Sequence, residues 1–328
     1  MKKIFIFNLI IVIFLIIVSE IILRTLKLSQ LMGMDSNILT FNDGYHSLKP
    51  NSSGLVFSKK VYIDKNKTRV PSFEFKYDKD KEIIFIGDSV TFGNGVEEEN
   101  TFVGLLRKKY TNYNFYNTAV PGHDLLNHEK TLNELSKFKK AEKIIYIFTL
   151  NDVLRDKTII DWNSRNQKEL DKGLGFIQKV IRNEFFRNIN FYLRNKSYIF
   201  MFLKGILTDP SKRWYTNIKI FYEENKINHL SVFLRKLVEF SKQRDSELHM
   251  IVLPYEFQTR DCKNISNYLP QRMIKKEILK VKINFIDFHN NFCKIKYPNK
   301  LFYKYDPMHL SEVGHKNVFK MIDREISF

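Results

Sequence analysis

The chain is poor in cysteine, tryptophan and glycine, with 2, 2 and 12 residues among 328. No Cys/His cluster has the spacing of metal ligands, so the sequence predicts no metal site. Cys262 and Cys293 could pair outside the cytoplasm, but spacing alone does not separate a disulfide from two buried thiols. Because glycine is scarce, the three glycines at 87, 93 and 95 attract attention.

The charge is also one-sided, with 54 basic against 36 acidic residues and a formal net charge of +18. Such an excess of positive charge suggests nucleic acid as the first candidate partner, and a membrane surface or an anionic polymer as the second. No zinc-finger spacing, RNA-binding signature or long basic run supports nucleic acid, so we expect none as a partner. The hydrophobic content of 44% suits one large domain, or one domain with insertions.

The N-terminal segment 1–24 is the longest apolar run. Lys2 and Lys3 precede "IFIFNLIIVIFLIIV", and about 19 apolar residues approach one bilayer crossing. The charges place the N-terminus in the cytoplasm and the rest of the chain outside. A cleaved signal peptide is the alternative, but "VSEIILRTLK" offers only Ser19 as a small residue near a cleavage point. We therefore predict an uncleaved single-pass anchor.

Beyond residue 80, short apolar strands alternate with amphipathic helices, which predicts a doubly wound parallel sheet within a domain at 81–328. Residues 25–80 form a polar connector that we expect to wrap one edge of this domain. Residues 155–226 break the alternation and predict a helical insertion that packs on the domain, caps the site or lies on lipid. The expected strands are 82–86, 113–120, 143–150, 248–254 and 283–288, and the expected helices are 101–110, 124–138, 227–244, 270–281 and 312–325.

The stretch "EIIFIGDSV" ends a buried strand on a serine, Ser89. Ligands of such sheets bind at the carboxyl ends of the strands, but a serine needs a base to become a nucleophile. His309 lies in "YDPMHLSEVGH" after the last expected strand, three residues beyond Asp306. In a tight loop or the first turn before a helix, this spacing lets the carboxylate orient the imidazole. The alternative is that both residues only shape a turn, with Ser311 as the cap of the helix.

Acyl transfer also needs donors for an oxyanion, and two further strand ends supply candidates. Gly122 in "NTAVPGHD" allows a close backbone approach, and Asn151 in "FTLND" could present its amide. Alone, Gly122 could mark an ordinary Pro-Gly turn and Asn151 a helix cap, a role open to Asp152 as well.

Together, "GDSVTFG" (87–93), "NTAVPG", "LND" and "DPMH" (306–309) resemble the four sequence blocks of the SGNH, or GDSL-type, serine hydrolases. The resemblance implies a flavodoxin-like three-layer α/β/α fold and an esterase mechanism without a cofactor. It implies Ser89 as nucleophile, His309 as base and Asp306 as its orienting carboxylate. It also implies an oxyanion hole formed by the Ser89 and Gly122 amides and the Asn151 side chain.

The sequence therefore predicts a membrane-anchored extracytoplasmic esterase or deacylase that acts on O-acylated envelope glycans or lipids. Two alternatives stay open. One is an O-acyltransferase for envelope polysaccharide with the same triad, and the other is a non-catalytic polymer-binding protein on a hydrolase scaffold. The oligomeric state and the acyl group are not predicted.

Overall fold

A computed structural model describes residues 2–26, 28–42, 45–138, 141–153, 184–207, 221, 227–281, 283–304 and 306–328. Most of the expected insertion at 155–226 lies outside these residues, and only 184–207 and 221 of it are described.

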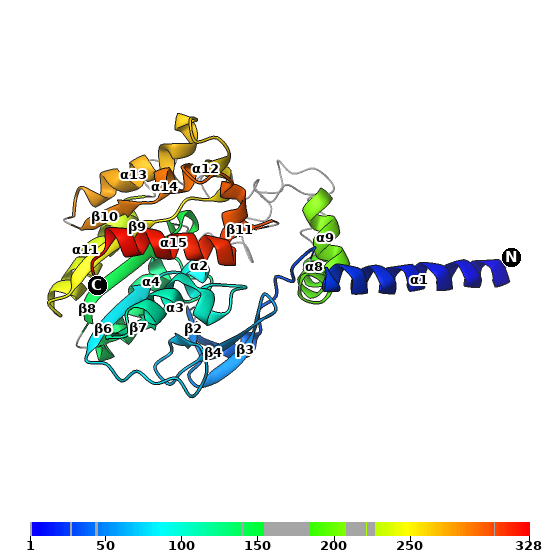
Figure 1. Cartoon of the computed structure of the whole chain (residues 1–328), viewed down its shortest axis with the longest axis horizontal. Coiled ribbons are helices and arrows are strands. Elements are labelled where there is room, and N and C mark those ends of the chain that lie inside the picture. The colour runs from blue at the N-terminus through cyan, green and yellow to red at the C-terminus, as the bar shows by residue number, and fades with distance from the viewer. Residues whose placement is uncertain are drawn as a thin grey trace.

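Five parallel strands form one side of the largest sheet, from its edge at β10 to β7 (Figure 1). Their order is β7 (Tyr113–Asn117), β6 (Lys81–Ile86), β8 (Ala141–Phe148), β9 (Glu247–Val252) and β10 (Asn284–Asp287). Numbered along the chain, this is the order 2-1-3-4-5 of the flavodoxin-like sheet. The predicted fold class is confirmed, and all five expected strands are present.

Helices cover both faces of this sheet because alternate residues of each buried strand point to opposite sides. Ile84 and Ile86 of β6 face the core under α4 (Leu125–Glu134), α11 (Asn228–Lys242) and α13 (Leu269–Ile278). Ile83 and Phe85 face the core under α3 (Phe102–Lys109) and α15 (Glu312–Glu325). The strands therefore have no polar face, as their continuous apolar sequences predict.

Three antiparallel strands that the sequence did not predict extend the sheet beyond β7. They are β5 (Arg69–Val70), β4 (Lys59–Ile63) and β3 (Ser52–Val56), all from the expected connector. The β3–β4 hairpin turns through Phe57 and Ser58, whose φ angles are 49° and 65°. Turns with two positive φ angles usually carry Asn-Gly or Asp-Gly, so this sequence gives no hairpin signal.

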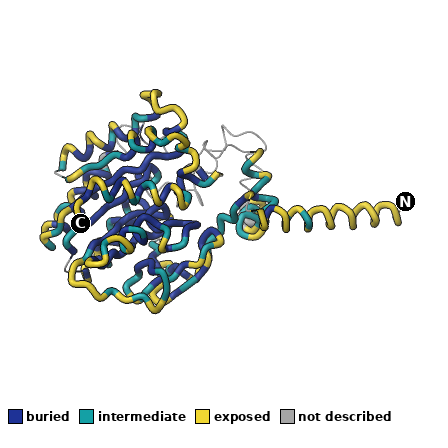
Figure 2. The backbone as a smooth tube through the Cα atoms, viewed as in Figure 1, coloured by how far each residue is buried: buried dark blue, intermediate teal, exposed yellow. Residues whose placement is uncertain are grey.

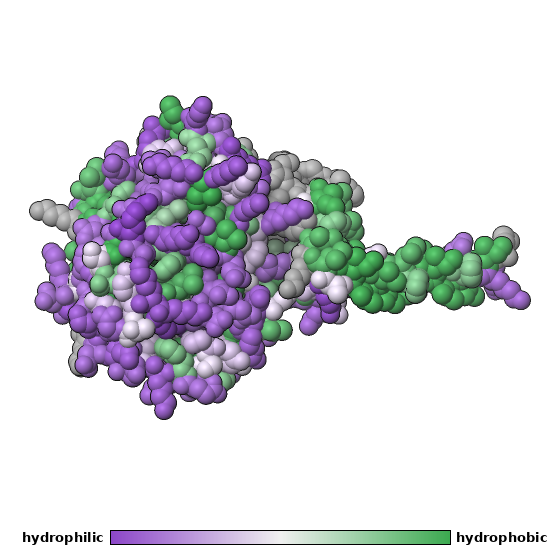
Figure 3. All heavy atoms as spheres, in the orientation of Figure 1, coloured by the Kyte–Doolittle hydropathy of each residue, from purple (hydrophilic) through white to green (hydrophobic). Residues whose placement is uncertain are grey.

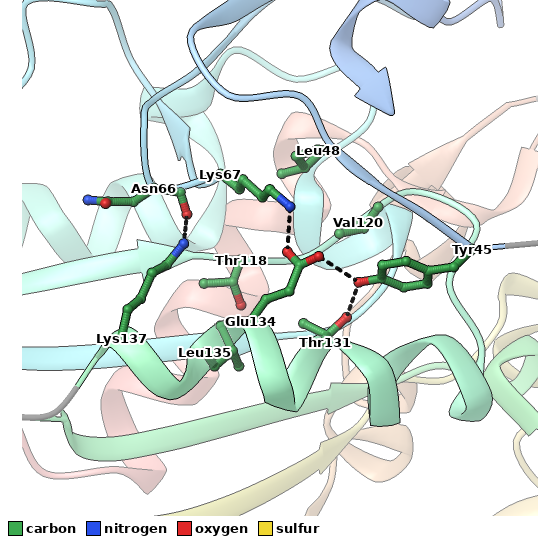
Figure 4. Close-up of a pocket in the computed structure, with 10 residues that line it drawn as sticks. All are labelled: Tyr45, Leu48, Asn66, Lys67, Thr118, Val120, Thr131, Glu134, Leu135 and Lys137. Atoms are coloured by element: carbon green, nitrogen blue, oxygen red, sulfur yellow. Dashed lines mark hydrogen bonds and ion pairs between the residues drawn. The ribbon is translucent and has the colours of Figure 1, made fainter. Parts of the chain in front are cut away.

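The connector is fixed to the domain through a small pocket beside α4 (Figure 4). Lys67 forms an ion pair with Glu134 at 3.0 Å, and the hydroxyl of Tyr45 lies 3.4 Å from both Glu134 and Thr131. Burial raises the pKa of Tyr45 to about 12, so its hydroxyl stays a hydrogen-bond donor at neutral pH. The pocket is lined by Tyr45, Leu48, Asn66, Lys67, Thr118, Val120, Thr131, Glu134, Leu135 and Lys137. Ser89 and His309 are not among these residues, so this hollow joins two parts of the fold and lies apart from the predicted site.

The N-terminal helix α1 (Lys2–Thr25) projects from the domain, with its side chains almost wholly exposed (Figures 1 and 2). Among the described residues, it is the one helix long and apolar enough to cross a membrane. Near its C-terminal end lie α8 (Glu184–Lys196) and α9 (Tyr198–Leu207), which belong to the expected insertion.

A disulfide joins Cys262 to Cys293, with their Cα atoms 6.0 Å apart. It links the loop after α12 (Glu256–Arg260) to the end of α14 (His289–Cys293), so the pairing left open by the sequence is present.

The remaining elements of the described residues are β1 (Leu39–Asn42), β2 (Tyr45–Leu48), α2 (Ser89–Phe92), β11 (Phe302–Tyr303) and β12 (Asp306–Leu310), with 3-10 turns at Ser36–Ile38, Glu98–Asn100, Leu135–Lys137, Leu150–Val153, Ile265–Tyr268 and Pro298–Leu301.

Candidate active site

Ser89 stands at the first residue of α2, immediately beyond the carboxyl end of β6. The preceding Asp88 caps this short helix by accepting a hydrogen bond from the Val90 N–H at 2.9 Å. A Cβ at position 87 would lie 2.2 Å from Thr91 Oγ1 and 3.0 Å from the carbonyl oxygen of Ile147. Only glycine fits there, so the strand turns sharply and delivers Ser89 to the rim of the sheet.

His309 reaches Ser89 from a segment 220 residues away, with Nε2 2.8 Å from the Ser89 Oγ. Its Nδ1 lies 2.6 Å from Asp306 Oδ2, so the three side chains form one hydrogen-bonded chain. All three are buried, with Ser89 and His309 each retaining 7% exposure. The arrangement gives the imidazole one nitrogen toward a carboxylate and the other toward a hydroxyl, as general-base activation of serine requires.

The backbone around Asp306 and His309 differs from our expectation. We expected a loop or the first turn before a helix, but both residues lie on β12, which pairs with β11. The carboxylate still reaches the ring because the chain bends around it: Asp306 Oδ1 accepts hydrogen bonds from the N–H groups of Met308 and His309. Ser311 caps α15 by accepting from the Gly314 N–H, as predicted.

Phe57 packs against the imidazole from the connector, a contact that the sequence did not predict. Its ring lies edge-on to His309 with centroids 5.2 Å apart, and its side chain is 6% exposed. The ring comes from the β3–β4 turn, so the connector forms one wall around His309 and limits its rotation.

Asn151 is oriented from both ends of its amide. Its Nδ2 donates to Asp88 Oδ2 at 3.2 Å, and its Oδ1 accepts from the Tyr255 hydroxyl at 2.7 Å and lies 3.0 Å from Thr149 Oγ1. An amide nitrogen carries two hydrogens, and Asp88 engages one of them. Tyr255 follows the end of β9 and was not predicted, although its place after a buried strand is the signal that could have identified it.

Asn151 and Asp152 both lie inside the 3-10 turn Leu150–Val153, so neither is the helix cap that was the alternative role for them. Asp152 accepts the N–H of Thr149 at 3.1 Å, and its other carboxylate oxygen lies 3.1 Å from the Thr149 hydroxyl oxygen. Burial, reinforced by the charge of Asp88, raises the pKa of the Asp152 carboxyl well above its ordinary value. Because Asp152 binds the turn, the Asn151 amide is directed toward Asp88, beside Ser89.

Gly122 adopts the left-handed conformation with φ of 83° in the loop after β7. This loop is tied to the turn before Ser89, since the Val120 N–H donates to the Gly87 carbonyl at 3.1 Å. A Cβ at position 122 would meet its nearest neighbour, His46 Nε2, at 3.5 Å, so conformation rather than crowding favours glycine here. The structure thus brings the loop of Gly122 to the same rim as Ser89.

Arg69 holds the loop that follows Ser89 and was also not predicted. This fully buried side chain donates to the carbonyls of Phe92, Gly93 and Val96 at 2.5 to 2.7 Å. Burial lowers the pKa of Arg69 to about 10, against the opposing charges of Glu98 and Glu97, so the guanidinium remains charged at neutral pH. It binds three carbonyls of this loop, which fixes the backbone after the nucleophile.

Two other histidines in the domain are structural. His128 contacts the Tyr146 hydroxyl at 3.0 Å, and His315 Nδ1 accepts from the Phe102 N–H at 3.3 Å. Burial lowers the pKa of each to about 3, so both rings stay neutral. Within the described residues, no three His, Cys, Asp or Glu side chains are grouped as metal ligands.

No family model and no curated protein matches this chain. Solved structures do match, with low identity. A member of the lipolytic G-D-S-L family from Veillonella parvula is 13% identical, with 75% of this chain and 98% of that chain covered and a TM-score of 0.42. A lipase/acylhydrolase from Enterococcus faecalis is 14% identical, with 75% and 95% covered and a TM-score of 0.43. Axe2, an acetylxylan esterase from Geobacillus stearothermophilus, is 16% identical, with 77% and 97% covered and a TM-score of 0.43. At this similarity the matches carry no argument about activity, which depends on the geometry of the site.

Proposed function

We propose that this chain is a serine esterase or deacylase with Ser89 as nucleophile, His309 as base and Asp306 as the orienting carboxylate. The observation that carries the proposal is the hydrogen-bonded chain of Asp306, His309 and Ser89, at 2.6 and 2.8 Å. Here both ring nitrogens are engaged, one by a buried carboxylate and the other by a serine hydroxyl.

In the proposed first step, Ser89 Oγ attacks the carbonyl carbon of an ester while His309 Nε2 takes the hydroxyl proton. The imidazolium that forms is stabilised by Asp306. His309 then returns the proton to the leaving alkoxide, so an alcohol departs and an acyl group remains on Ser89. Water attacks this acyl-enzyme with His309 again as base, which releases the carboxylic acid and restores the serine.

Negative charge on the carbonyl oxygen requires donors already in place. We assign this role to the Ser89 and Gly122 N–H groups and to the second hydrogen of the Asn151 amide. Support comes from the fixed orientation of Asn151, whose oxygen accepts from Tyr255 while its nitrogen donates to Asp88, so that the oxygen turns away from the substrate. A side chain preorganised in this way needs little rearrangement as charge develops.

The proposal includes location and substrate. We infer that α1 anchors the chain, with Lys2 and Lys3 in the cytoplasm and the domain outside, where O-acylated envelope glycans or lipids occur. The Cys262–Cys293 disulfide supports an oxidising compartment. Hydrogen bonds that Glu20 of α1 accepts from N–H groups of α9 support an anchor that is retained, because a cleaved signal would be lost from the fold.

A fluorophosphonate probe tests the chemistry on the full chain in nanodiscs. Wild type should be labelled and Ser89→Ala should not, whereas Ser266→Ala, an exposed serine, should keep the label. Acetate release from acetylated glycans, with and without an acceptor sugar, then separates hydrolysis from acyl transfer. A folded wild-type chain that takes no label and cleaves no ester would overturn the proposal.

A further inference from the structure

The helices α8 and α9 are held against the end of α1 by one acidic side chain. Glu20 of α1 accepts hydrogen bonds from the Tyr198 N–H at 2.8 Å, the Ile199 N–H at 3.0 Å and the Ser197 hydroxyl at 3.2 Å. The carboxylate thus binds N–H groups at the start of α9 that have no partner within their own helix. This contact fixes the height of α9 along α1.

Further contacts continue beyond Glu20. The Arg24 guanidinium lies 5.1 Å from the centre of the Tyr198 ring, and the Ser29 hydroxyl donates to the Tyr198 carbonyl at 2.8 Å. The Met32 N–H donates to the carbonyl of Arg194 in α8 at 3.1 Å. The helix pair is therefore bound both to the end of α1 and to the chain that leaves it.

The position of Glu20 places this contact at a bilayer surface. From Lys2 to Glu20 an α-helix rises about 27 Å, at about 1.5 Å per residue. The hydrocarbon core of a bilayer is about 30 Å thick. With Lys2 and Lys3 among the headgroups of one leaflet, Glu20 reaches the headgroup boundary of the other. Both α8 and α9 run across the line of α1 rather than along it (Figure 1), which is parallel to such a surface.

The helix pair carries apolar side chains that the domain does not cover. In α9, Leu203, Ile206 and Leu207 are 48%, 61% and 78% exposed. In α8, Phe186 and Ile189 are 43% and 38% exposed. This surface joins the apolar surface of α1 without a polar break in the view of Figure 3. With 10 residues, α9 is about 15 Å long, too short to cross the membrane itself.

We propose that α8 and α9 form an interfacial helix pair, seated in the outer boundary of the bilayer beside α1. This inference rests on the membrane anchoring included in the proposed function. Helices that lie in the interface bury apolar side chains among the acyl chains and direct cations toward headgroups. Arg24, Lys196 and Lys204 supply those cations, and they suit an anionic leaflet. Lipid is the occupant that the geometry favours, because the apolar surface continues from a helix of membrane-spanning length.

The chain that leaves α1 beside this helix pair also contacts the residues around the proposed active site. Gln30 donates to the Phe57 carbonyl at 3.3 Å, and the Phe57 N–H donates to the Gly33 carbonyl at 2.7 Å. Phe57 in turn contacts His309. From Thr25 to Gln30 the chain spans at most about 19 Å, at about 3.8 Å per step. The proposed active site therefore lies a short and fixed distance above the leaflet.

Depth-dependent fluorescence quenching tests the position of the helix pair in the bilayer. The full chain is placed in nanodiscs whose lipids carry bromine on their acyl chains. Single tryptophans are placed at Leu15 in α1, Leu207 in α9 and Leu279 after α13. Leu279 is the matched control, since it is also 78% exposed but directly follows α13, a helix on the part of the domain away from α1 (Figure 1). The signal of the parent chain is subtracted each time, because it contains two native tryptophans.

We expect the tryptophans of Leu15→Trp and Leu207→Trp to lose most of their added fluorescence, and that of Leu279→Trp to keep it. Quenching at position 15 without quenching at 207 would overturn the proposal that the helix pair lies in the bilayer interface, and would leave the anchor intact. That outcome would indicate a protein or a second copy of the chain over α9. No quenching at position 15 would overturn both the anchor and the interfacial position of the helix pair. Labelling of Ser89 by the fluorophosphonate probe would still test the chemistry separately.

Discussion

Tyr255 offers a test of the proposed oxyanion donor that leaves the donor itself in place. Its hydroxyl donates to Asn151 Oδ1 at 2.7 Å, and Tyr255→Phe removes that bond while keeping the buried ring. Asp88 still accepts from the amide nitrogen, and Thr149 Oγ1 still lies 3.0 Å from the same oxygen, so the amide keeps part of its restraint. A neutral hydrogen bond contributes about 1 kcal/mol, which corresponds to roughly a fivefold change in rate. Complete loss of an oxyanion donor costs about 100- to 1,000-fold.

We therefore expect Tyr255→Phe to lower kcat for p-nitrophenyl acetate about fivefold with little change in KM, and Asn151→Ala to lower it about 100-fold or more. Tyr268→Phe is the matched control, since its hydroxyl also donates at 2.7 Å, to Asp287 away from Ser89. The decisive measurement is the double variant. If Tyr255 acts through Asn151, its loss should cost nothing further in the Asn151→Ala background. An equal loss in both backgrounds, or an equal loss in Tyr268→Phe, would refute the reasoning.

Three further outcomes follow from contacts in the domain. Asp306→Asn should lower kcat by about 10⁴ with the fold retained by circular dichroism, because the ring loses its orienting acceptor; unchanged turnover would remove Asp306 from the mechanism. Replacing Cys262 and Cys293 together by serine should lower the free energy of unfolding by about 3 to 4 kcal/mol, from a loop of 31 residues. An unchanged urea midpoint would contradict that figure. Burial lowers the pKa of His128 to about 3, so the unfolded chain binds more protons at acid pH. Stability should therefore fall as pH drops below about 6.5 toward 3, and His128→Gln should make the decline shallower in thermal melts.

The central sheet was predictable because its strands are buried on both faces. Continuous apolar runs such as "EIIFI" and "KIIYIF" have few other uses in a globular chain, and their alternation with amphipathic helices implies parallel pairing. Once the strands are located, the residues directly after their carboxyl ends are located as well. Ser89 and Asn151 could therefore be named before any coordinates, and the side chain of His309 indeed lies beside Ser89.

The parts that were missed depend on contacts between segments with weak local signals. The β3–β4 hairpin turns on Phe57 and Ser58 without a glycine, so the connector reads as a loop. Arg69 follows Lys65 and Lys67 in a polar stretch, and only the fold shows that it binds three carbonyls. The disulfide likewise depends on how α12 and α14 meet, which two cysteines in a sequence do not reveal.

The Glu20 contact bears on how this protein is prepared. A chain cut after residue 27 would lack the carboxylate that receives the first amide groups of α9, and would present Leu207 and its apolar neighbours to water. Such a fragment should associate with itself unless detergent is supplied, even if Ser89 and His309 remain correctly placed. A cut beyond Gln30 would in addition release the Phe57 carbonyl beside the imidazole, so shortening at the amino end should reduce activity as well as solubility.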